Sequence, residues 1–404
     1  MEKQLFISIV INNRYLSKII FKYVSEICYE INHSRRHIDW YLLRESPNLL
    51  ALNRYYDLLK QWFQRYRYEK IDLESLVVAA VIGGSIEIVD HLIDRFQIDR
   101  QTDRCTLNTI LIAASKYNRL TIIQHLWNQY QFEWNYYKSM VLAPYSKNID
   151  ILSLLVDRYN KHELFQQQQQ KFVEIDYDKD GNVFDNAAYV GNIEMLEYLR
   201  ESRTKDLEHS FIFIKAVTSD QLELLRYLLA SSDFNHLKDV HLVNNLTALD
   251  IALQRKHQVE IAISLLDAGC KTRYTGIMNR ISSIGSIKLM ESYHRRNFTE
   301  PTSVSLDHLN YYNYIESVKW LQSHSYPLTA TTNAMDTACR LGNLEVVKYL
   351  HYNRSEGCTM EAIDISIEND HVEVVKFLYQ NRTEGSKKMS SQEISKWINE
   401  NQKI

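Results

Sequence analysis

An acidic stretch near the middle of the chain has the residue types and spacing of a cation site. Asp176, Asp178 and Asp180 alternate with other residues, and a glycine follows them. Oxygen ligands at positions 1, 3 and 5 with a glycine at position 6 suit a calcium loop. Ala187 stands where such a loop needs its bidentate glutamate. We therefore predict an acidic turn over 176–185, with cation binding as the alternative.

Two histidines have a spacing that could hold a metal. His33 and His37 are four residues apart, so a helix would place both imidazoles on one face. No cysteine or carboxylate stands at a supporting spacing for zinc, and Arg35 and Arg36 between them repel a cation. The sequence also contains no phosphate-binding glycine loop and no serine nucleophile motif. We predict no metal, no cofactor and no enzymatic activity.

Basic and aromatic residues are interleaved between Trp40 and Lys70. This combination could bind single-stranded nucleic acid by stacking and phosphate contact. An amphipathic helical cap with its aromatic residues turned inward explains the same pattern. The net charge of −3 gives no general attraction for nucleic acid or a membrane surface. We favour the cap and expect that nucleic acid is not a partner.

The composition is that of a soluble globular protein, with 404 residues, 45% hydrophobic and 24% charged. Five cysteines without a CxxC pair predict reduced thiols and a cytoplasmic location, with the nucleus as the alternative. The longest apolar runs, such as 77–82, are too short to cross a bilayer. Residues 1–13 lack the basic region of a signal peptide. We therefore expect no membrane association.

The elements that would position a site repeat along the chain. Residues 334–357 align with residues 362–385, and 11 of the 24 positions are identical. Each copy contains two short helical patterns separated by a break such as Gly342-Asn343. Neither helix is long enough to be stable alone in water. The copies must therefore bury their apolar faces against one another in a stacked solenoid.

The repeat can be followed through most of the chain by the apolar residue that opens each second helix. The spacings between these residues run from 28 to 44. The predicted openings are Ile86, Leu120, Ile149, Ile193, Leu222, Val259, Ile287, Ile315, Leu344 and Val372.

Three regions follow from this pattern. Residues 1–72 are predicted to form a helical N-terminal cap region, with one helical run over 49–68. Residues 73–386 form the solenoid of about ten units, and a glutamine-rich stretch predicts a flexible loop at 157–177. Residues 387–404 form a C-terminal capping helix.

Two segments indicate a repeat family. Residues 247–252 read TALDIA and 265–269 read LLDAG, which resemble the T-P-L-H-x-A and L-L-x-x-G motifs of ankyrin repeats. Residues 178–199 resemble the family's D-x-D-G-N opening. The resemblance implies an all-α solenoid of stacked helix-turn-helix repeats. The clean units are shorter than the family period of about 33 residues and lack the motif's proline, which suggests reduced finger loops.

The resemblance also implies where a partner binds. In ankyrin-like stacking the ends of the first helices face the concave surface, so we expect a non-enzymatic, monomeric scaffold or adaptor that binds a protein partner there. The alternative is a substrate receptor whose residues 1–72 recruit a modifying complex, as an F-box module does. The candidate partner-binding residues are Lys116, Tyr117, Tyr145, Tyr189, Gln254, Arg255, Tyr311, Tyr312, Arg340 and Glu368.

Overall fold

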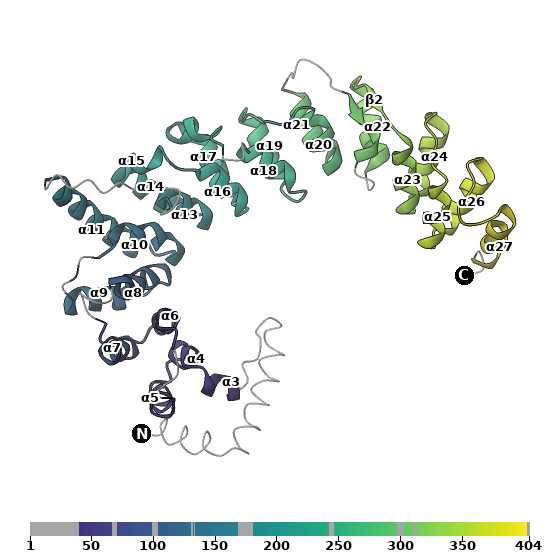
Figure 1. Cartoon of the computed structure of the whole chain (residues 1–404). Coiled ribbons are helices and arrows are strands. Elements are labelled where there is room, and N and C mark those ends of the chain that lie inside the picture. The colour runs from purple at the N-terminus through teal and green to yellow at the C-terminus, as the bar shows by residue number, and fades with distance from the viewer. Residues whose placement is uncertain are drawn as a thin grey trace. The chain divides into compact units, whose positions relative to one another are not determined.

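The computed structural model describes residues 40–66, 71–98, 104–130, 132, 134–168, 181–241, 246–296, 303–309 and 313–401 (Figure 1). These residues form two compact units. Unit 1 comprises the chain up to Asn186 together with Glu197–Arg203. Unit 2 comprises Ala187–Leu196 and the chain from Thr204 onward.

The described part of unit 1 consists of helices joined by short turns. Its elements are α3 (Trp40–Glu45), α4 (Pro47–Leu52), α5 (Tyr56–Arg65), α6 (Leu73–Gly83), α7 (Ile86–Arg95), α8 (Arg104–Lys116), α9 (Leu120–Gln129), α10 (Tyr136–Leu142), the 3-10 helix η1 (Ala143–Ser146) and α11 (Ile149–Gln168). Two further helices, α13 (Val183–Val190) and α14 (Ile193–Ser202), contribute residues to both units.

Unit 2 is also built almost wholly of helices where the structure describes it. Its elements are α15 (Thr204–Leu207), α16 (Ile212–Thr218), α17 (Leu222–Ala230), η2 (Ser232–Leu237), α18 (Ala248–Gln254), α19 (Val259–Asp267), α20 (Ile277–Ile284), α21 (Ile287–His294), β1 (Val304–Ser305), η3 (Leu306–His308), α22 (Tyr314–Ser323), β2 (Leu328–Thr329), α23 (Thr332–Arg340), α24 (Leu344–Asn353), α25 (Glu361–Glu368), α26 (Val372–Asn381) and α27 (Ser391–Asn401).

The helices stack in pairs, which confirms the all-α repeat solenoid. First helices pack on first helices, as α6 does on α4 and α8, and as α23 does on α25. Second helices pack likewise, as α24 does on α26. Small residues such as Ala80 and Ala338 are fully buried at these contacts and let neighbouring backbones approach. Nine of the ten predicted second-helix openings are the first residue of a helix, and the tenth helix begins at Tyr314, one residue before Ile315.

Most helix pairs, although not α18–α19, turn from the first to the second helix through a residue in the left-handed region. The size of this residue limits which side chain the next pair can place over the turn. At Gly84, Gly191 and Gly342, the following pair lays a side chain directly on the glycine. A Cβ at Gly191 would meet the Gln221 amide, and a Cβ at Gly342 would lie 2.5 Å from His371 Nδ1. The overlying side chain then donates to the end of the previous first helix, as His371 Nε2 does to Arg340 O over 3.0 Å. These donors satisfy carbonyls that a helix end leaves unpaired.

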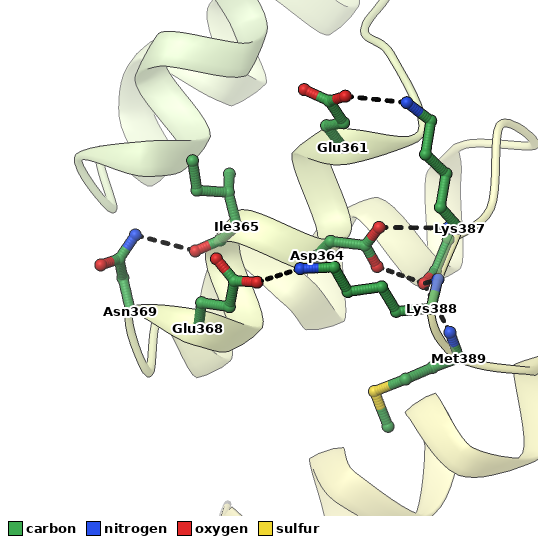
Figure 2. Close-up of polar contacts among 9 residues, drawn as sticks. Glu361, Asp364, Ile365, Glu368, Asn369, Lys387, Lys388 and Met389 are labelled. Carbon is green, nitrogen blue, oxygen red and sulfur yellow. Dashed lines mark hydrogen bonds and ion pairs between the residues drawn. The ribbon is translucent and has the colours of Figure 1, made fainter.

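A second link joins successive pairs in unit 2 through an aspartate. Asp336, on α23, accepts from the backbone N–H of Thr359 at 2.8 Å and from its hydroxyl at 2.9 Å. Asp307 binds Thr331 in the same way, at 2.9 Å for both bonds. Asp364 accepts from the Ser386 hydroxyl and from Lys387 N–H, which attaches the C-terminal segment to α25 (Figure 2). The segment before α27 is therefore bound as if it opened another repeat.

The N-terminal region differs from the single helical run expected over 49–68. The helix ends at Leu52 and a new one, α5, begins at Tyr56. The break falls at Arg54, whose φ is +63°, and α4 packs on α6 as a first helix does. Ser46 caps α4 with Pro47 in its first turn, the arrangement that Thr247 and Ala248 have at α18. Residues 46–65 thus form a further helix pair.

Two other expectations were wrong. The loop expected at 157–177 is helical as far as Gln168, because glutamine, leucine and glutamate favour helix and this stretch is held by contacts. Tyr159 is buried, and Arg203 donates to Asn160 and Glu163 at 2.8 Å. The first helix expected before Ile315 is replaced, in the described residues 303–309, by β1 and η3. β1 pairs in parallel with β2.

Candidate functional site

The candidate residues of unit 1 converge where α8 ends. Lys116 is the last residue of α8, and its Nζ lies 5.5 Å from the centroid of the Tyr117 ring and 5.4 Å from that of Tyr145. The Tyr145 hydroxyl donates to Asn186 Oδ1 at 3.0 Å, which fixes the ring between neighbouring pairs. Tyr117 remains 39% exposed. An ammonium group between two aromatic rings is held by cation–π attraction of about 0.5–1 kcal/mol.

Among the candidate residues at the start of unit 2, some are exposed and one caps a helix. Tyr189 is 45% exposed, and its backbone carbonyl accepts from Gln221. Gln254 is exposed and donates to the Tyr274 hydroxyl at 2.8 Å. Arg255 Nη1 donates to Thr218 O at 2.7 Å, so its guanidinium caps the end of α16. The sequence alone did not distinguish this structural role from partner binding.

The remaining candidates lie toward the end of unit 2. Arg340 is exposed at the end of α23. Glu368, the last residue of α25, forms an ion pair with Lys388 of the C-terminal segment. Glu361, the first residue of the same helix, pairs with Lys387 at 2.8 Å (Figure 2). Both glutamates are therefore already engaged by lysines. Tyr311 and Tyr312 lie outside the described residues.

Sequence reasoning missed two residues beside the Lys116 cluster, Arg54 and Arg119. Arg119 donates from Nε to Val81 O at 3.2 Å and from Nη2 to Ile82 O. Arg54 Nε donates to Gly83 O. Both guanidinium groups therefore bind the last carbonyls of α6. A usable signal was present, because Arg119 directly precedes the predicted opening of a second helix.

The described residues contain no group of three or more histidines, cysteines or acids that could hold a metal. The acidic stretch at 176–180 and the pair His33 and His37 lie outside those residues. Burial raises the pKa of Cys270 to about 11 and that of Cys358 to about 12, and it also raises the pKa of Cys339. These thiols are protonated at neutral pH and are poor nucleophiles.

The helix pairs α23–α24 and α25–α26 carry the sequence that identifies the repeat. Residues 335–378 match the family model described as ankyrin repeats in many copies. These two helix pairs are therefore similar to ankyrin repeats. No curated protein matches the chain. The ankyrin match includes two candidate residues, Arg340 and Glu368, and it includes Asp336 and Asp364, which link each repeat to the segment that follows. Among the described helices, none is long and apolar enough to cross a membrane.

Proposed function

We propose that this protein is a non-enzymatic scaffold or adaptor that binds a partner protein on the face where the first helices end. Ankyrin repeats generally mediate interactions between proteins. The observation that carries the proposal is the cluster of Lys116, Tyr117 and Tyr145, in which a cation and two rings from successive pairs meet at the surface. Tyrosine gives a large contact area at low entropic cost and is frequent among binding hot spots.

The structure supports a cluster that is preorganised rather than loose. Tyr145 is held by Asn186, whose own Nδ2 donates to Val141 O at 2.7 Å. Lys116 in turn lies against both rings. A partner that binds here orders few additional side chains, and binding then loses less conformational entropy. The proposal also includes a monomeric state and a cytoplasmic location, in keeping with the buried thiols.

The test is capture of a partner from the native cell extract with the full chain and two variants. Tyr117→Ala removes an exposed ring that makes no hydrogen bond through its hydroxyl to any described residue. Tyr352→Ala is the control, because Tyr352 is 69% exposed on the second helix α24 of unit 2. We expect the partner to be lost with Tyr117→Ala and retained with Tyr352→Ala. Equal capture by both variants would reject the surface.

The alternative function is recruitment of a modifying complex by residues 1–72, and its test must leave the helix stack intact. Part of that region, α4 and α5, packs into the helix stack, since α4 lies against α6. Deleting all 72 residues would therefore uncover the side of α6 that packs on α4 and confuse binding with unfolding. Deleting residues 1–39 avoids this. Loss of a co-captured modifying complex with target binding intact would favour the receptor role over a simple scaffold.

A further inference from the structure

Arg54 and Arg119 place two positive charges side by side at the end of α6. Both guanidinium groups are fixed by hydrogen bonds to the last carbonyls of this helix. A Cβ at Gly84, whose φ is +76°, would lie 3.1 Å from Arg119 Nε and 3.2 Å from Arg54 Nη2. The two groups therefore approach the same point, and a side chain at Gly84 would intrude between them.

Nothing in the described part of the chain neutralises this pair. No carboxylate there lies within ion-pair distance of Arg54 or Arg119, whereas Arg203 has Glu163 at 2.8 Å. The end of a helix supplies about half a negative charge, which does not balance two cations. Each guanidinium has five N–H donors, and the carbonyl bonds use one on Arg54 and two on Arg119. The others remain available to a ligand.

The neighbouring turns extend the positive charge. Lys116 ends α8 directly before the turn that contains Arg119, and Lys147 occupies the left-handed position of the turn after η1, with φ of +55°. The four turns at 53–55, 84–85, 117–119 and 146–148 contain no acidic residue. The whole chain has a net charge of −3, so the positive character is local to these turns.

We propose that these turns of unit 1 bind an acidic segment of a protein partner, with Arg54 and Arg119 holding its carboxylates. This inference rests on the proposed protein-binding function and names the chemistry of the partner. Guanidinium groups bind carboxylates through paired N–H···O bonds with well-defined geometry. A protein ligand is favoured over nucleic acid because Lys116 already lies against the rings of Tyr117 and Tyr145, which leaves them less open to stacked bases.

The chain itself supplies substitutions that remove the charges and keep the turns. Gln221 overlies Gly191 as Arg119 overlies Gly84, and it donates to the previous helix end in the same way. Arg119→Gln therefore keeps a donor. Asn118 has a φ of +57°, close to that of Arg54, so Arg54→Asn suits the left-handed turn. The control is Lys256→Gln with Lys319→Gln, which removes two exposed cations from unit 2.

The measurement is fluorescence anisotropy of a labelled oligoglutamate peptide of about ten residues titrated with the full chain. We expect Arg54→Asn with Arg119→Gln to weaken binding about tenfold or more, and the control pair to change it little. Thermal melts check that both variants are folded. Unchanged binding in the arginine variant, or equal loss in both variants, would overturn the proposal. Tighter, arginine-dependent binding of labelled oligouridine would also overturn it, in favour of a phosphate ligand.

The capture experiment separates this inference from the proposed function. If Tyr117→Ala loses the partner while the arginine variant keeps both the partner and oligoglutamate, the acidic ligand is wrong and the binding surface stands. If oligoglutamate binding depends on the arginines while Tyr117→Ala captures the partner normally, the anion site stands and the surface around Tyr117 is wrong.

Discussion

The turns between first and second helices share a left-handed backbone position in both units, except at α18–α19, but the residues at that position differ in charge. In unit 1 the left-handed position is occupied by Arg54, Gly84, Asn118 and Lys147. In unit 2 the same position is occupied at several turns by glycine, and by Asp220 and Asp370 at two others. Two of these four positions in unit 1 are therefore cationic, whereas the residues other than glycine at this position in unit 2 are aspartates.

The two units show which properties of the turn residue folding requires and which can vary. Folding requires a residue that tolerates positive φ, because the chain reverses there. A bare glycine is needed where the next pair lays a ring directly on the turn, as His371 does on Gly342. Other left-handed residues instead accept a hydrogen bond from the next pair, as Asp220 does from Gln258 at 3.1 Å and Asn118 from Asn148 at 2.9 Å. Lys147 and Asp370 are exposed at this position, and their side chains make no hydrogen bond to any described residue, so the charge there can vary. The turn charges of unit 1 are thus available for recognition.

The largest expected loss of stability comes from replacing a turn glycine that the next pair covers. In Gly342→Ala the new Cβ would lie 2.5 Å from the rigid His371 ring and displace its bond to Arg340 O. Left-handed strain and the lost bond together predict a destabilisation of about 3 kcal/mol. Gly84→Ala meets only the flexible ends of two arginines, so we expect about 1–2 kcal/mol. Urea denaturation measures both, and an equal or larger loss for Gly84→Ala would contradict the argument.

A smaller effect tests how the pairs are linked. Asp336→Ala removes two bonds to Thr359 and leaves its half-buried N–H unpaired, which predicts a loss of about 2 kcal/mol. In unit 1, Asn108 makes a single, exposed bond to Asn135 N–H at 2.8 Å. We expect Asn108→Ala to cost about 0.5 kcal/mol. Chemical denaturation would disprove the linkage if the two variants were equally stable.

The smallest expected effect on stability comes from reversing the charge of a turn residue in unit 2. Asp370→Lys gives unit 2 a cation at the left-handed position, which Lys147 already tolerates. Since Asp370 is exposed, we expect the free energy of unfolding to change by less than about 0.5 kcal/mol. Oligoglutamate binding should not increase, because none of the described arginines donates to the end of α25 as Arg54 and Arg119 donate to that of α6. A clear gain in anisotropy would mean that one turn cation suffices.

The sequence predicted the helix pairs well because their apolar spacing repeats. Ile86 and Leu344 each open a helix, as their place in the pattern required. The extension of α11 to Gln168 was missed, since a glutamine run fits both loop and helix and only contacts such as Arg203 to Glu163 decide between them. The break at Arg54 was missed because arginine gives no turn signal.

The candidate site was predicted only in part, for a related reason. Tyr117 and Tyr145 were found by their position after each small residue, and the structure brings them together around Lys116. Arg255 follows the same rule yet caps α16. Whether a turn residue faces outward or back onto the previous pair depends on the side chains of the neighbouring pair, and a repeat pattern does not contain that information.

Because Ser386 binds Asp364, the C-terminal segment with α27 could cap an earlier repeat in the same way. Thr359 makes the equivalent contact with Asp336, one repeat earlier. A shortened protein could therefore join residue 357 directly to residue 386, and Asp336 would receive the Ser386 hydroxyl. Lys388 would then face Arg340 in place of Glu368, so the graft would also need Lys388→Glu. Array length in this protein could thus be adjusted one repeat at a time.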